Sequence, residues 1–85
     1  MFPGIDIPQV IVEVPYKGST PAEVERDITN ILEESLATMG GIEELRSSSS
    51  QNGAEIDLRM KWGENVATKS LEAREKVDAV RHLLP

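Results

Sequence analysis

The 85-residue chain carries nine lysines and arginines against fifteen aspartates and glutamates, which gives a formal net charge of −6, and it contains no cysteine. This composition excludes a disulfide framework and a thiolate zinc site, and it lacks the basic face that nucleic-acid binding requires. No apolar run approaches the roughly 20 residues that span a bilayer, and the first four residues lack the regions of a signal peptide. We therefore expect one small domain, soluble by itself, with a thin core and no nucleic-acid partner.

A strand is predicted over residues 8–15. Val10, Val12 and Val14 alternate with Ile11 and Glu13, and this is the period of a strand with one buried face.

A helix is predicted over residues 20–39. Thr20 is a suitable N-cap, Pro21 occupies the first helical position, and Glu23 lies three residues after the cap. These side chains can satisfy amide donors that the first turn leaves unpaired, and Gly40-Gly41 provide a left-handed stop. The stripe expected to pack on the sheet consists of Val24, Ile28, Ile31, Leu32 and Leu36.

Two further strands are predicted, over residues 43–50 and 54–62, and Asn52-Gly53 between them is a strong signal for a tight hairpin turn. The serine run 47–50 could instead be a flexible linker, but the adjoining hairpin favours a strand. Leu45 and Ser47 can face either the core or the open side. The second of these strands has an apolar face of Ala54, Ile56, Leu58, Met60 and Trp62, and a wet face of Glu55, Asp57, Arg59 and Lys61.

A second helix is predicted over residues 65–84, with Asn65 as its N-cap. Its inward stripe consists of Val66, Ser70, Ala73, Val77, Val80 and Leu84. The element order β-α-β-β-α predicts an α+β fold, a truncated ferredoxin-like two-layer sandwich whose antiparallel sheet has the order 1-3-2 and lacks the fourth strand.

The missing strand has a physical consequence. The complete sheet has the order 4-1-3-2, so its absence leaves the strand 9–14 as an open edge, blunted at its ends by Pro8 and Pro15. An open edge attracts another chain. We therefore expect the isolated chain to form a homodimer, in which two 9–14 strands pair antiparallel about a two-fold axis.

The sequence offers little catalytic chemistry. Catalysis requires a nucleophile beside a base, a pair of carboxylates with separated pKa values, or a bound metal. His82 is the only histidine, and its place in the last turn of a helix favours a structural role. The adjacent glutamates at 33–34 and 43–44 point in different directions. We therefore predict a protein that is not an enzyme, with no catalytic residue, no cofactor and no metal site.

The wet face of the sheet has the best functional prospects. In a two-layer sandwich both helices cover one face, and the other is free for solvent, a partner or a ligand. Plain solvent exposure is the competing interpretation. This face is expected to comprise Glu13, Glu55, Asp57, Arg59 and Lys61, with some of the serines.

Several short motifs follow one another along the chain. They are Phe2-Pro3, the proline-bounded strand 8–14, Tyr16-x-Gly18 before a helix with Ala22, Val24 and Glu25, Gly41-Ile42-x-x-Leu45, the serine run 47–50, the strand ending at Trp62, Gly63-Glu64-Asn65, and Leu83-Leu84-Pro85. In this order and spacing they resemble the first porter subdomain of bacterial resistance-nodulation-division multidrug efflux transporters, the AcrB/AcrD/AcrF-like family.

The resemblance implies a non-catalytic piece of a trimeric inner-membrane pump that exports small molecules using proton influx, with this segment in the periplasm. It also implies a transmembrane helix before Phe2 and a fourth strand after Pro85. The implied partners are the other subdomains, two further protomers, a periplasmic adaptor, an outer-membrane channel and the small-molecule substrates. The helix 65–84 would line the central pore, and the implied substrate-cleft residues are Glu13, Ser49, Glu55, Asp57 and Arg59.

The charges on the wet face are a departure from this family. Drug-exporting relatives often have neutral polar residues where this chain has Glu13, Glu55, Asp57 and Arg59, so the face can instead pack on another subdomain or select charged substrates. The alternative function is a stand-alone ferredoxin-like module, either a small-ligand regulatory domain or an assembly domain, because this architecture serves many functions.

Overall fold

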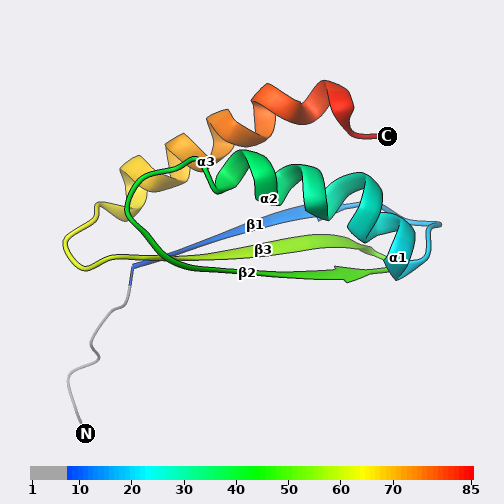
Figure 1. The fold of residues 1–85 in the computed structure, drawn as a ribbon, viewed down its shortest axis with the longest axis horizontal. Helices are drawn as coiled ribbons and strands as arrows, with labels where there is room; N and C mark the ends of the chain where they lie inside the picture. Colours follow the sequence, from blue (N-terminus) through cyan, green and yellow to red (C-terminus); the bar gives the residue numbers. More distant parts are fainter. Residues whose placement is uncertain (1–7) are drawn as a thin grey trace, which may run out of the picture.

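The computed structural model describes residues 8–85, which form a three-stranded sheet with helices on one face (Figure 1). The strands have the order β1-β3-β2, and both pairings are antiparallel. This confirms the predicted α+β fold, a truncated ferredoxin-like sandwich. Phe2-Pro3 of the motif series lie outside the described residues. The elements are β1 (Gln9–Pro15), α1 (Pro21–Val24), η1 (Glu25–Thr29), α2 (Asn30–Leu36), β2 (Ile42–Ser50), β3 (Gly53–Met60), α3 (Val66–Val80) and η2 (Arg81–Leu83).

The first helical segment begins at the predicted cap. The Thr20 hydroxyl oxygen accepts a hydrogen bond from the Glu23 backbone N–H at 3.2 Å, and it donates to the Glu23 carboxylate at 3.1 Å. These two contacts supply a partner for an amide of the first turn, which has no carbonyl within the helix to bond.

The helix expected over residues 20–39 is interrupted by one π turn, η1, and its regular part ends at Leu36. The Asn30 N–H donates to the carbonyl of Glu25, five residues back. This wider turn places the adjacent residues Ile28 and Thr29 in the interior, each 1% exposed. The sequence pattern predicted only Ile28 there, so the π turn adds a buried hydroxyl that needs a hydrogen-bond partner.

The core lies between the helices and the apolar face of β3. Four of its side chains, Leu32, Leu36, Ile56 and Leu58, are 0% exposed. The prediction that Trp62 ends this apolar face is wrong, because β3 ends at Met60 and the Trp62 side chain is 70% exposed in the following turn. The buried apolar set is Val10, Val24, Ile28, Leu32, Leu36, Met39, Ala54, Ile56, Leu58, Met60 and Ala73.

The second helix, α3, packs against α2 and β1, and it is capped as predicted, because the Asn65 side-chain oxygen accepts from the Thr68 N–H at 3.0 Å. It ends at Val80 and continues as the 3-10 turn η2 rather than as an α-helix to residue 84. Of its predicted inward stripe, only Ala73 is fully buried, while Val66 is 41% exposed. Most of the α3 surface is therefore exposed.

Polar contacts fix α3 at its start and middle. The Ser35 hydroxyl on α2 donates to the Lys76 carbonyl at 2.8 Å. The Lys69 ammonium lies 3.1 Å from the Glu72 carboxylate and 3.6 Å from that of Glu64. The hydrogen bond to Glu72, followed by the attraction of Glu64, raises the pKa of Lys69. None of the helices within residues 8–85 combines the length and apolar character needed to cross a membrane.

Candidate functional site

The face of the sheet that carries no helix is the candidate site. Residues directly opposite each other on paired strands share a face. Because Ile56 and Leu58 are buried under the helices, Glu55, Asp57 and Arg59 alternate to the other side. We call this side the open face.

The strand pairing places further residues of β1 and β2 on the open face. Glu13 of β1 lies opposite Glu55, and Ser48 of β2 lies opposite Glu55 from the other side. Glu13, Glu55, Asp57 and Arg59, four of the five predicted cleft residues, therefore lie together. The other residues that the register assigns to this face are Gln9, Ile11, Glu44, Arg46 and Ser50.

The fifth predicted cleft residue, Ser49, lies on the opposite side. It pairs with Ala54, whose side chain is buried, and its hydroxyl is 2.8 Å from that of Thr29 on η1. Ser47 also faces the helices, since its hydroxyl donates to the Glu33 carboxylate on α2. Placing Ser49 on the open face is therefore corrected: it serves as the partner of the buried Thr29 hydroxyl.

The charges of the open face are only partly compensated. Gln9 donates a side-chain hydrogen bond to Asp57 at 2.7 Å, and Arg46 pairs with Glu44 at 2.6 Å. Glu13 and Glu55 lie directly opposite each other and are both exposed. Two like charges directly opposite each other on paired strands destabilise a sheet slightly. The Glu13–Glu55 pair therefore does not contribute to the stability of the fold.

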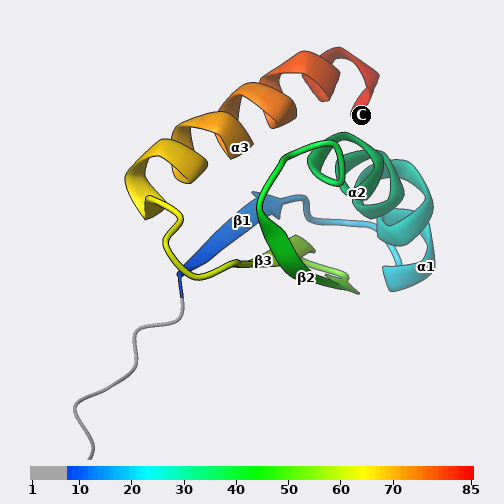
Figure 2. The ribbon, with the colours of Figure 1, turned by 60° about the vertical axis from the view of Figure 1, so that its left-hand side comes forward.

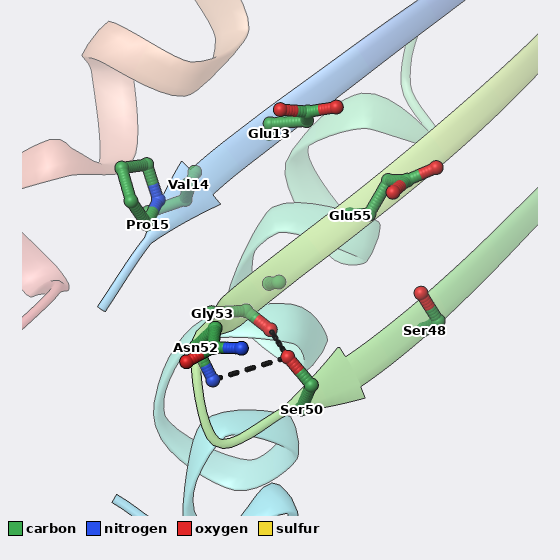
Figure 3. Close-up of a pocket in the computed structure, with 9 residues that line it drawn as sticks. Glu13, Val14, Pro15, Ser48, Ser50, Asn52, Gly53 and Glu55 are labelled. Atoms are coloured by element: carbon green, nitrogen blue, oxygen red, sulfur yellow. Dashed lines mark hydrogen bonds between the residues drawn. The ribbon is translucent and has the colours of Figure 1, made fainter. Parts of the chain in front are cut away.

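A shallow hollow of about 260 Å³ lies at the hairpin end of this face. Figure 3 shows Glu13, Glu55 and Ser48 projecting from the three strands on the same side. The rim is held by the turn, where the Ser50 hydroxyl accepts from the Asn52 N–H at 3.1 Å and donates to the Gly53 carbonyl at 3.3 Å. The hollow can accept hydrogen-bond donors or cationic groups through its carboxylates.

The open face offers charged and polar side chains to any molecule that contacts it. Within residues 8–85, no group of three histidine, aspartate or glutamate side chains is placed to hold a metal ion. Arg26 lowers the pKa of Asp27 chiefly through a hydrogen bond, but this pair lies on η1, in the helical layer. The open face thus presents exposed charges suited to contact with a partner or a ligand.

Sequence reasoning missed Gln9, Glu44 and Arg46 as members of the open face, and it did not determine which of the serines belong to it. The signal that would have found Ser48 is the loop length of the hairpin. A two-residue loop at Gln51-Asn52 pairs Ser50 with Gly53, and alternation then places Ser48 beside Glu55. A turn centred on Asn52-Gly53 does not define the pairing of Ser50, so the face on which each serine lies stayed undetermined.

Comparisons with a family model and with individual proteins both relate the chain to multidrug resistance proteins. The model of the AcrB/AcrD/AcrF family matches residues 1–85. The chain is similar to multidrug resistance protein MdtC of Escherichia coli K12, with 28% identity over 84 residues. It is also similar to the MdtC proteins of Citrobacter koseri and Klebsiella pneumoniae, with 26% identity to each. In each case the alignment covers 99% of this chain but 8% of the relative, so the chain spans about a twelfth of the length of these relatives.

Proposed function

Because the chain belongs to the AcrB/AcrD/AcrF family, we propose that it forms a porter-type subdomain, on the periplasmic side, of a proton-driven inner-membrane efflux transporter. The observation that carries this proposal is the family match along the whole chain, combined with a sheet that leaves one polar face without helices. Its role is to bind and guide small molecules rather than to transform them.

The open face contributes to the substrate route in this proposal. Carboxylates at Glu13, Glu55 and Asp57 and the guanidinium of Arg59 reach solvent from one side of the sheet. Such charges change the rate and selectivity of charged-ligand entry more than they change the overall affinity. The chain would therefore favour substrates that carry charge, in particular cationic groups at the end where the two glutamates meet.

The remaining surfaces serve assembly. Exposed apolar side chains lie on α3 at Leu71 (62%) and on the following turn η2 at Leu83 (56%), which supports a place for this helical segment against two further copies around a central pore. The other subdomains, a periplasmic adaptor and an outer-membrane channel complete the proposed pump.

Two opposite charges on the open face allow a test with an internal comparison. In the intact transporter, Asp57→Ala is expected to weaken export of cationic substrates by about fivefold, since an exposed charge contact contributes about 1 kcal/mol. Arg59→Ala is expected to weaken export of anionic substrates and to spare cationic ones. Resistance and dye efflux are measured for a cationic, an anionic and a neutral compound.

Glu34→Ala provides the matched control, because Glu34 is an exposed carboxylate on α2, in the helical layer. It should leave export of all three compounds unchanged. Membrane abundance of each variant is compared by immunoblot. Unaltered export of every substrate class by both open-face variants would refute a role for this face in the substrate route.

A further inference from the structure

One buried hydroxyl joins the helical layer to the strand β2. Thr29 on η1 is 1% exposed, and its hydroxyl lies 2.8 Å from that of Ser49 on β2. One helical turn further on, the Glu33 carboxylate accepts a hydrogen bond from the Ser47 hydroxyl. Figure 2 shows α2 on the β2 side of the helical layer and α3 on the β1 side. Serine hydroxyls therefore make the polar contacts between β2 and the helix above it.

Residues 47–50, which we call the hairpin half of β2, have no apolar side chain to anchor them. All four are serines, whereas the apolar side chains of β2, Ile42 and Leu45, pack against the core in the other half of the strand. Within residues 8–85, β2 pairs with another strand on one side only, where it meets β3. The position of the hairpin half therefore depends on its pairing with β3 and on its hydroxyl contacts with the helix.

The position of Thr29, in contrast, is set by the apolar core. The fully buried apolar residues of this helical segment repeat at intervals of four: Val24, Ile28, Leu32 and Leu36. Three turns of an α-helix take about 11 residues, but the last of these residues lies twelve after the first. The π turn takes up the extra residue, because the Asn30 N–H bonds to the carbonyl five residues back rather than four. The buried stripe therefore fixes the winding of η1, and with it the inward direction of Thr29.

Ser49 connects this fixed hydroxyl to the open face. The preceding residue, Ser48, projects from the other side of β2, as adjacent residues of a strand do. It lies opposite Glu55 and lines the hollow at the hairpin end, where Figure 3 shows it on the same side as Glu13 and Glu55. Because Ser48 and Ser49 are consecutive in the backbone, a movement of Ser49 away from the core displaces Ser48 and changes the shape of the hollow.

We propose that Thr29 is a positioning residue for the open face: through Ser49 it holds the hairpin half of β2 and keeps Ser48 at the rim of the hollow. The consequence for transport rests on the proposed function, in which the open face borders the substrate route. The positioning itself can be measured without transport. Loss of the Thr29 hydroxyl should loosen the hairpin half of β2 and leave β1 and the apolar core unchanged.

Hydrogen exchange of the purified intact transporter, followed by mass spectrometry, tests the positioning. Thr29→Val keeps the shape of the side chain and removes its hydroxyl. Peptides that cover residues 45–51 should exchange about fivefold faster in this variant, because the local opening of β2 no longer has to break that hydrogen bond. Peptides that cover residues 9–15 should exchange at the unchanged rate. Thr29→Ser retains the hydroxyl and should restore slow exchange in residues 45–51.

Ser35→Ala is the matched control for the loss of a hydroxyl between two elements. The Ser35 hydroxyl joins α2 to α3 through the Lys76 carbonyl, at 2.8 Å, so its removal should leave the exchange of residues 45–51 unchanged.

Export of a cationic and of a neutral compound is measured for the same variants at equal membrane abundance. Thr29→Val should lower export of the cationic compound, relative to the neutral one, by about threefold, which is less than the loss of a charge that contacts the compound directly. Thr29→Ser should restore the ratio of the two export rates. A loss of stability alone would lower both rates together and leave their ratio unchanged.

Three results would overturn the positioning role. The first is unchanged exchange of residues 45–51 in Thr29→Val, and the second is the same acceleration there in Ser35→Ala. The third is equal acceleration over residues 9–15, because it would indicate a general loss of stability. Faster exchange confined to residues 45–51, with an unchanged ratio of export rates, would support positioning by Thr29 and refute the place of the hollow in the substrate route. The failure of one proposal is thus distinguishable from the failure of the other.

Discussion

Replacing Leu58 with alanine is expected to lower the free energy of unfolding by about 3 kcal/mol, as is usual for a leucine truncated inside a core. Leu58 is 0% exposed, and it lies on β3, the central strand, which is paired with β1 on one side and β2 on the other. For a domain of this size the loss corresponds to a fall in Tm of about 15 °C. Chemical denaturation followed by circular dichroism measures it.

Leu71→Ala is the matched control for this truncation. Leu71 has the same side chain but is 62% exposed on α3, so its loss should change the unfolding free energy by about 0.5 kcal/mol or less. Similar losses at the two positions would contradict the assigned core.

Replacing Gly53 with alanine is expected to destabilise the chain by about 3 kcal/mol, through strain and overlap at a position that only glycine tolerates. Gly53 has φ +140°, and a Cβ there would overlap the Val14 carbonyl oxygen and lie 2.9 Å from Pro15 Cα and Tyr16 N. These are backbone atoms of the end of β1 and of the residue that follows it, so the overlap is relieved only by moving this part of the backbone. Thermal unfolding of the variant measures the loss.

Gly18→Ala separates the cost of backbone strain from the cost of steric overlap. Gly18 also has a positive φ, +94°, but a Cβ there meets no atom within 4 Å. Its substitution should cost only the backbone strain, about 1 kcal/mol. If Gly53→Ala costs no more than Gly18→Ala, the close approach of β1 to the hairpin is not as described.

The elements of this fold were predictable because their signals are local. The cap at Thr20, the cap at Asn65 and the alternation of Ile56 and Leu58 with charged neighbours each depend on a few consecutive residues. The element order then predicts the sheet order through a known supersecondary unit. For the same reason Glu13, Glu55, Asp57 and Arg59 could be grouped on one face before the structure was known.

The incorrect predictions concern side chains whose position depends on contacts with residues distant in the sequence. The π turn at Glu25–Thr29 buries Thr29 against Ser49, 20 residues away, and no local pattern predicts that pair. The side of β2 on which each serine lies depends on the register with β3, which shifts at an irregularity between Ile42 and Glu44. Trp62 fits the apolar period, but the strand ends before it. Propensity and period set the elements, while register and packing set which side chains meet.

The proposed place of the open face beside the route of exported molecules can be tested by the protection of a single engineered thiol. In the full-length transporter, Asp57→Cys and the control Glu34→Cys are labelled with a membrane-impermeant maleimide, with and without a saturating export substrate. We expect substrate to slow labelling at position 57 several-fold and to leave labelling at position 34 unchanged. Equal labelling rates at position 57 with and without each substrate would contradict it.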